Sequence, residues 1–272
     1  MRIRQAARVA DDDFRSALAP GLRVSADAER VAGEIAFSAG RLAQLAADPP
    51  GLYAEVRDHD DAEEALWLGF LIAYLGPLEG DDPFSAIAAA RTSWHGGELP
   101  RLDEAETGPR GAHEQARGDP TVIAYRAWAQ RAGAQAAAFA GEPHWPPERR
   151  FARAFERLAL PGMRRETRFD LLVSLGRLGR LDVSAGSLFF GGGDDATVAA
   201  KRVLGIGDPL LLDRRAGELA QACGVPLEAL DLALFNWQRD EPRTTLGARG
   251  DTLDASVRDR AAAALGVGSG ET

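Results

Sequence analysis

Residues 141–182 read GEPHWPPERRFARAFERLALPGMRRETRFDLLVSLGRLGRLD, and this stretch decides the fold prediction. Its order indicates a helix that begins at residues 146–147, a Leu-Pro-Gly break at residues 160–162 and a second helix from about Arg165. Proline in the first turn of a helix costs little, whereas a Pro-Gly pair ends one. Asp182 follows the second helix. The stretch therefore predicts two helices joined by a tight hairpin.

Composition favours a helical protein for the rest of the chain. Ala, Leu, Arg and Glu dominate the 272 residues, and alternating runs of β-branched residues are scarce. The hydrophobic content of 45% is enough for an ordinary globular core. We therefore expect an all-α fold with at most one short β-hairpin, near residues 181–190.

Hydrophobic spacing and helix-ending residues place the other elements. Residues 95–119 contain five glycines and two prolines without periodicity, which predicts a long loop. We expect an N-terminal helical extension over 1–60, a helical core over 61–240 and a partly flexible C-terminal tail over 241–272. The further helices expected are 25–47, 61–75, 83–91, 120–141, 194–204, 209–223 and 226–237, with one weak helix in the tail.

Charge is unevenly distributed along the chain. The formal net charge of -9 argues against a nucleic-acid partner. The segment 148–180, however, carries nine arginines against four acidic residues, a local balance of +5. This segment therefore predicts a basic surface on an otherwise acidic protein.

Several kinds of chemistry have few residues to support them. Lys201 is the one lysine that a Schiff-base mechanism could use, and Cys223 is the one cysteine. A lone cysteine allows no intramolecular disulfide, no cysteine zinc site and no four-cysteine cluster. We expect no metal and no cofactor, and a reducing, cytoplasmic setting. No secretory signal is visible, and the apolar run 65–78 is shorter than the roughly 20 residues that span a bilayer, so we expect no membrane partner.

The order helix, Leu-Pro-Gly hairpin, helix, aspartate resembles the helix-hairpin-helix core of base-excision DNA glycosylases. Residues 125–141 resemble the helix before that motif and residues 66–75 the apolar helix that opens the core, so the resemblance spans about 61–240. It implies that the hairpin and the start of the second helix face a DNA phosphate. The DNA-binding residues it implies are Gly162, Arg164, Arg165, Thr167 and Arg168.

Two positions depart from the family's hairpin. Arg164 stands where the family has the second glycine of Gly-x-Gly, and its guanidinium can reach a phosphate in place of a close backbone approach. Glu166 stands where strand-cleaving members carry lysine, which excludes lyase activity through that position.

Asp182 and Trp145 are the candidate residues for contact with a base. The resemblance implies that Asp182 is the catalytic carboxylate, which stabilises positive charge on the sugar or orients water. The alternative is an aspartate at a turn that accepts local hydrogen bonds. Trp145 lies in a proline-flanked loop and is the base-stacking candidate, although most tryptophans are core residues.

A second Gly-x-Gly occurs at residues 205–207, between two expected helices, and Asp231 follows it. We rank this hairpin second because the helices before it do not match the family's order, and we interpret Asp231 as an exposed carboxylate of an amphipathic helix. Residues 200–209 (AKRVLGIGDP) and 231–237 (DLALFNW) are similar to the α-glutamyl/putrescinyl thymine pyrophosphorylase clade. That similarity implies chemistry at a substituent on a DNA base.

Three functions follow as hypotheses. The first is a DNA-base-acting enzyme, on a modified pyrimidine and without lyase activity, that extrudes its target base. The alternative is a non-catalytic DNA-binding or interaction protein that retains the fold. The third is a helical protein with no nucleic-acid role, which the overall acidity favours. The sequence leaves the oligomeric state open.

Overall fold

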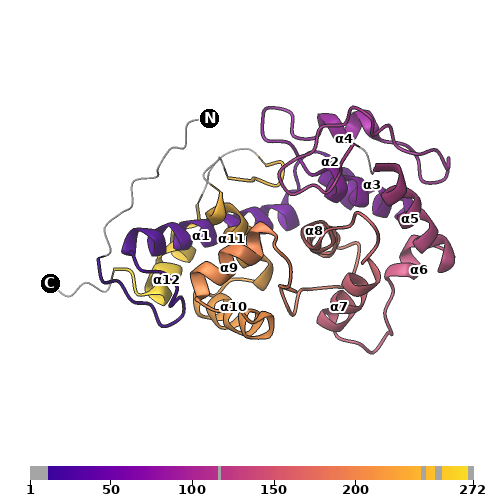
Figure 1. Ribbon diagram of the computed structural model, residues 1–272. Helices are drawn as coiled ribbons and strands as arrows, with labels where there is room; N and C mark the ends of the chain where they lie inside the picture. The colour runs from indigo at the N-terminus through magenta and orange to yellow at the C-terminus, as the bar shows by residue number, and fades with distance from the viewer. Residues whose placement is uncertain (1–11, 116–117, 240–242, 249–252, 269–272) are drawn as a thin grey trace. The chain divides into compact units, whose positions relative to one another are not determined.

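The computed structural model describes residues 12–115, 118–239, 243–248 and 253–268, and among them it contains helices and no strand (Figure 1). The all-α prediction is confirmed. Residues 181–190, the one place where a short β-hairpin was expected, form turns and irregular backbone. Ser184 N donates to Pro147 O at 3.5 Å, and Phe189 has a φ of 54°. The backbone at Ser184 thus bonds to the start of a helix instead of to an opposing strand.

The described residues form twelve helices. They are α1 (Ser25–Ala47), α2 (Leu52–Asp58), α3 (Ala62–Leu75), α4 (Ser85–Ala90), α5 (Gly118–Arg131), α6 (Gln135–Phe139), α7 (Pro147–Arg157), α8 (Arg165–Arg177), α9 (Asp195–Leu204), α10 (Pro209–Cys223), α11 (Leu227–Gln238) and α12 (Ala255–Leu265).

Helix α3 is apolar almost all round because it is surrounded by other helices. Its residues 65–75 are all buried. Asp61 caps its N-terminus by accepting from the backbone N–H groups of Glu63 and Glu64, at 2.8 and 3.1 Å. Gly76, with a φ of 71°, ends it. Helices α2 and α8 pack directly against α3.

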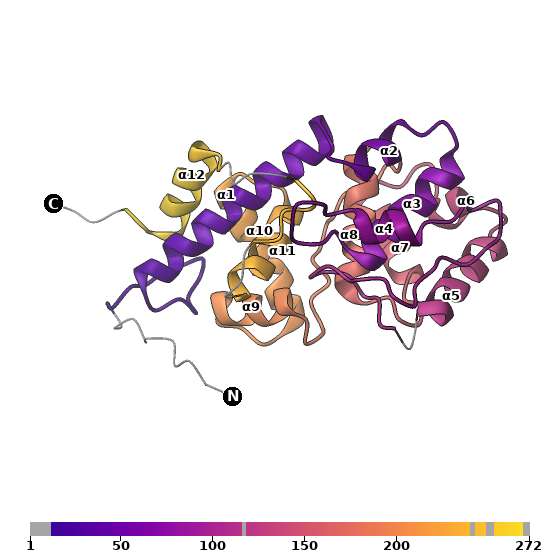
Figure 2. The same cartoon turned by 90° about the horizontal axis from the view of Figure 1, so that it is seen from above.

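The chain divides into two compact units, each discontinuous in sequence. One comprises the described residues of Met1–Ala39, Phe190–Glu241 and Thr252–Thr272, and in it α9 packs against α10 and α11, as Figure 1 shows. The other comprises the described residues of Gly40–Phe189 and Pro242–Asp251, with α3 at its centre (Figure 2). These units do not coincide with the three consecutive segments expected from the sequence, because residues distant along the chain pack in each of them.

Local structure differs from the expected pattern in two places. The single helix expected over 120–141 is two helices, because Gly133 takes a φ of 88° and the chain restarts as α6. Helix α2 was missed, since it is only seven residues long and directly follows two prolines. The long loop expected over 95–119 is present without a helix up to residue 115, and α5 already begins at Gly118. None of the described helices is both long and apolar enough to cross a membrane.

Candidate nucleic-acid interface

The Leu-Pro-Gly hairpin joins α7 to α8, and its glycine is required by packing. Gly162 has a φ of 77°, and a Cβ atom there would overlap the Thr121 side chain of α5. A small cavity of about 190 Å³ lies beside it, lined in part by Met163, Arg164 and Glu114. The structure therefore explains Gly162 by its contact with α5, without a bound phosphate.

The five predicted DNA-binding residues do not share one exposed surface. Gly162 and Arg164 are exposed, and Arg164 forms an ion pair with Glu114 of the long loop before α5. Arg165 is only 8% exposed, and its Nη1 donates to the backbone oxygen of residue 188 at 2.9 Å. Thr167 is fully buried. Two of the five side chains are thus directed into the protein, where a DNA backbone does not reach them.

Arg168 is also engaged inside the protein. Its Nη1 donates to Phe155 O at 3.1 Å, and its guanidinium lies 4.2 Å from the centroid of the Phe155 ring. Burial, followed by the charge of Arg165, lowers the pKa of Arg168 from its ordinary value. The start of α8 therefore uses its arginines to hold α7 and the 188–189 segment.

Arg150 joins Asp182 to the loop that contains Trp145, although these two segments are far apart in sequence. Nη1 of Arg150 donates to the Asp182 carboxylate, and Nη2 donates to Pro143 O at 2.8 Å. Trp145 is partly exposed, and the guanidinium of Arg149 lies 4.3 Å from its ring centroid. We call this surface the α7 patch and define it by five residues: Trp145, Arg149, Arg150, Arg153 and Asp182.

Two loops carry residues of the α7 patch, one before α7 with Trp145 and one after α8 with Asp182, and both are held against the start of α7. The hydroxyl of Ser184 donates to Glu148 Oε1 at 3.1 Å, and a Cβ atom on Gly186 would press on the same glutamate. On the other side, a Cβ atom on Gly141 would lie within 3.0 Å of Trp145 and Arg150. The patch is therefore held by packing as well as by one ion pair.

The setting of Asp182 differs from that of a carboxylate in a closed active site. Its side chain is 71% exposed, and its partner is a guanidinium of α7. The alternative interpretation was an aspartate that accepts hydrogen bonds from local N–H groups of a turn. The structure instead pairs Asp182 with Arg150 of α7, a helix distant in sequence. An exposed carboxylate beside arginines and a tryptophan is suited to contact with a polar ligand on the surface.

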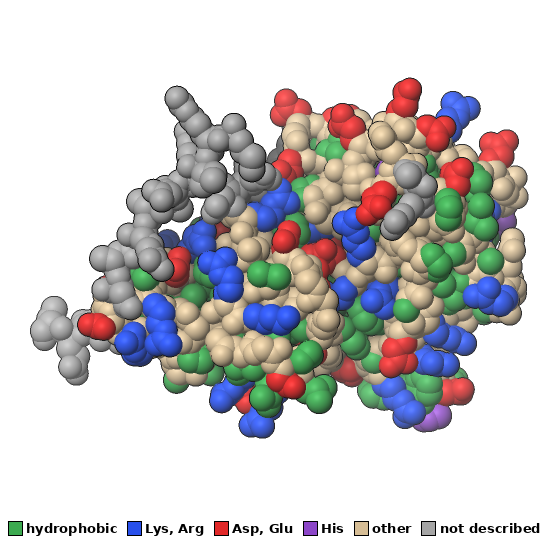
Figure 3. Space-filling model, in the orientation of Figure 1, with side chains coloured by type: hydrophobic (Ala, Val, Ile, Leu, Met, Phe, Trp, Pro, Cys, Tyr) green, Lys and Arg blue, Asp and Glu red, His purple; other side chains and the backbone are tan. Residues whose placement is uncertain are grey.

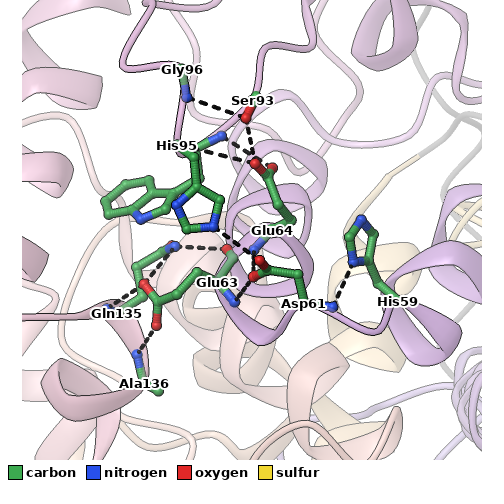
Figure 4. A network of polar contacts seen from close by, with 10 residues as sticks. His59, Asp61, Glu63, Glu64, Ser93, His95, Gly96, Gln135 and Ala136 are labelled. Carbon is green, nitrogen blue, oxygen red and sulfur yellow. Dashed lines mark hydrogen bonds and ion pairs between the residues drawn. The ribbon is translucent and has the colours of Figure 1, made fainter.

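Helix α3 presents three carboxylates at its N-terminus, of which Asp61 and Glu64 contact the long loop and Glu63 contacts α6 (Figure 4). Asp61 caps α3 and contacts His95 Nε2 at 3.0 Å. Glu63 accepts from the backbone N–H groups of Gln135 and Ala136, at 2.8 and 3.0 Å, and so caps α6. Across the described residues, no group of three or more His, Cys, Asp or Glu side chains has the arrangement of a metal site.

Glu64 fastens the long loop to α3. Its carboxylate accepts from the Ser93 hydroxyl and from Trp94 N, the latter at 3.1 Å. Behind it, the Arg126 guanidinium lies 4.6 and 4.7 Å from the ring centroids of Trp67 and Trp94. Burial alone would raise the pKa of Glu64, but these hydrogen bonds outweigh it and lower that pKa.

Glu64→Gln is expected to lower the melting temperature at pH 7 and to flatten its decline in acid. A carboxyl pKa that is lower in the folded state contributes stability above its unfolded value, and this stability is lost as pH falls through the folded value. The check is thermal unfolding between about pH 7 and pH 3, which covers the ordinary range of glutamate pKa values. Asp60→Asn is the control, and equal acid sensitivity in both variants would contradict the role of Glu64.

The second Gly-x-Gly is a helix end that packs on Gly21. Gly205 is the left-handed C-cap of α9, and a Cβ atom there would lie 3.2 Å from Gly21 N. Asp208 caps α10 by accepting from Leu211 N at 3.0 Å, which puts a carboxylate where a phosphate would bind. Asp231 is 1% exposed, so its interpretation as an exposed carboxylate is wrong. The apolar neighbours of Asp231 in DLALFNW were the available signal for burial.

Sequence reasoning also missed a buried ion pair between the long loop and α8. Arg110 Nε and Nη2 donate to the two carboxylate oxygens of Asp170, each at 2.6 Å. The nearby Tyr53 is fully buried, and burial, followed by the charge of Asp170, raises its pKa. The two partners are sixty positions apart in the sequence, and no sequence pattern joins them.

Comparisons with known proteins add no relative from which the site could be interpreted. No family model matches the chain, and no match was found among curated proteins or solved structures.

Proposed function

We propose that this protein binds DNA and that the α7 patch is its contact surface. The observation that carries the proposal is that Arg150 bonds both to Asp182 and to Pro143 in the loop of Trp145, while the Arg149 guanidinium lies over the tryptophan ring. A partly exposed tryptophan offers a face on which a base can stack, and adjacent arginines attract the phosphate backbone. The resemblance to helix-hairpin-helix glycosylases also favours DNA as the partner.

The charge distribution supports this choice of surface. The protein carries a formal net charge of -9, so non-specific attraction to DNA over the whole molecule is weak. Figure 3 shows blue Lys and Arg side chains gathered where α7 lies, mixed with acidic ones. Arg149 and Arg153 are exposed on α7, seven and three residues before Glu156 in the same helix. Binding is therefore expected to be local, moderate and sensitive to salt.

A base-acting enzyme is the second candidate, and the ion pair that holds Asp182 to Arg150, which also bonds to the loop of Trp145, favours it. In this version the base leaves the stack, lies against Trp145 and exposes its sugar or substituent to the Asp182 carboxylate. The glycosylase and thymine pyrophosphorylase resemblances favour a modified pyrimidine. Glu166 in place of lysine favours a reaction without strand cleavage.

Trp145→Ala combined with Arg149→Gln is expected to weaken DNA binding by about 5- to 150-fold, because a stacked base contributes about 1–3 kcal/mol. The measurement is fluorescence anisotropy of labelled single-stranded and duplex DNA at about 50 mM and about 200 mM salt. Arg214→Gln on α10 is the control, since it removes one exposed positive charge from the other unit, as Arg149→Gln does from the patch.

Three outcomes of this titration would count against the proposal. Wild-type protein that binds no DNA at low salt would rule out both DNA hypotheses. Unchanged affinity in the α7 patch variant would move the contact elsewhere. Loss of affinity in Arg164→Ala with Arg168→Ala, but not in the patch variant, would place DNA on the hairpin instead.

The enzyme hypothesis has a separate test. Mass spectrometry of nucleosides after incubation with normal and hypermodified DNA detects a changed or released base. Asp182→Asn is expected to abolish that change while DNA binding persists. Full activity in Asp182→Asn would remove Asp182 from the mechanism, and no change by the wild type would leave a DNA-binding protein.

A further inference from the structure

A groove of about 760 Å³ lies between α4 and the segment 99–106, away from the α7 patch residues. Its apolar lining comes from Ala86, Ala89 and Ala90 of α4 and from Leu99. The volume falls within the range of sites that enclose small molecules, about 300–1,000 Å³.

Hydrogen bonds hold both walls of the groove in place. Arg101 N donates to Ala90 O at 3.2 Å, which ties the segment to the end of α4. Leu102 is buried behind it, and its backbone oxygen lies 3.0 Å from His113 Nε2. A Cβ atom on Gly118 would overlap the Leu102 side chain, which shows how closely this residue is enclosed. The groove is therefore a packed part of the fold.

The rim of the groove is strongly acidic. Asp103, Glu104, Glu106 and Asp119 line it, and Arg101 is the one basic residue among its lining residues. Within the described part of the chain, no hydrogen bond or ion pair engages these four carboxylates, and all four residues are exposed. Figure 3 shows acidic side chains gathered over α4 and the loop that follows it, at the upper edge of the view.

We propose that this groove binds a small organic cation, an ammonium group carried on an apolar body. The alanines and Leu99 contact the body, and the carboxylates of the rim pair with the ammonium group. Four acids against one arginine repel phosphate and carboxylate ligands. The same charge excludes DNA from this groove, so the inference does not depend on the function proposed for the α7 patch.

The test compares three six-carbon probes that differ only in the head group: n-hexylammonium, n-hexanol and hexanoate. Binding is followed by calorimetry and by amide NMR shifts on the full chain at about pH 7. The expected order is hexylammonium first, hexanol weaker and hexanoate without binding.

Variants separate the roles of the rim and the lining. Asp103→Asn, Glu104→Gln and Glu106→Gln together are expected to weaken hexylammonium binding about tenfold, from the loss of several exposed pairs. Ala89→Trp keeps every carboxylate and fills the groove, and is expected to abolish binding. Glu29→Gln, Asp48→Asn and Asp259→Asn together give the same change of net charge on other exposed surfaces and are expected to leave affinity unchanged.

Three results would overturn the inference. Equal affinity for hexanol and hexylammonium, together with normal hexylammonium binding by the triple rim variant, would show that charge has no part in the site. Unchanged binding by Ala89→Trp would show that the cation pairs with surface carboxylates outside the groove. Absence of any hexylammonium binding by the wild type would remove the site altogether.

Discussion

Asp170→Ala is expected to lower the free energy of unfolding by about 3–5 kcal/mol, the usual loss when one partner of a buried ion pair is removed. The Arg110 side chain is only 3% exposed, and two of its guanidinium nitrogens donate to Asp170 at 2.6 Å. Without the carboxylate, a buried cation loses its counter-charge. Urea unfolding at pH 7, followed by circular dichroism, measures the change.

An exposed pair supplies the control for this prediction. Glu218→Ala on α10 removes the partner of Arg214, whose side chain is 74% exposed, at an Nε to Oε1 distance of 3.0 Å. Water screens this pair, so we expect a much smaller loss of stability than in Asp170→Ala. Arg110→Met combined with Asp170→Leu is expected to recover most of the lost stability, because two apolar side chains leave no buried charge. A loss in Asp170→Ala no larger than in Glu218→Ala would contradict the buried pair.

Phe70→Ala is expected to cost about 3–5 kcal/mol of unfolding free energy through the cavity it leaves. Phe70 lies on α3 with no exposed surface, and its ring stacks on Tyr125 of α5 at a centroid distance of 3.8 Å. Trp67 and Tyr74 stack on either side of Phe70 along α3, at 5.3 and 5.6 Å. The ring therefore joins α3 to α5, and its loss removes packing that neither neighbour can replace.

Leu210→Ala is the matched control for Phe70→Ala. Leu210 is an apolar residue of α10 that is 81% exposed, so its truncation is expected to change stability by about 0.5 kcal/mol or less. Unfolding of both variants in urea, with similar denaturant dependence, isolates the effect of burial. If Phe70→Ala lost less than about 1 kcal/mol, the aromatic cluster would not form the core between α3 and α5.

The helical elements could be predicted from local sequence because their signals are local. Hydrophobic spacing and the double proline bounded α1 at 25–47, and Pro209 with Gly224 bounded α10 at 209–223. The acids before the apolar run at 65–75 indicated the N-terminus of α3. Where the signal was weak, prediction failed: Gly133 divides an alanine-rich stretch, and α2 is too short to show a period.

The candidate site was predictable only in part. Trp145 and Asp182 were each singled out by residue type and by position after a loop or helix. Their convergence was not, since it depends on Arg150 reaching both segments. Conversely, Arg165 and Thr167 followed the family pattern but are buried, because α8 packs its first turn against α7 and the 188–189 segment.

By itself the sequence determined that this protein is helical, where most of its helices begin and end, and which stretch is basic, because these properties depend on neighbours within one or two helical turns. Only the tertiary structure decided which polar residues face solvent and which charges meet. The Arg110–Asp170 pair, the contact between Arg150 and Asp182 and the acidic groove beside α4 each join residues whose distance in space has no trace in their spacing along the chain. The physical reason is packing: burial of the α3 core brings distant segments together, and the side chains left at their edges form the sites.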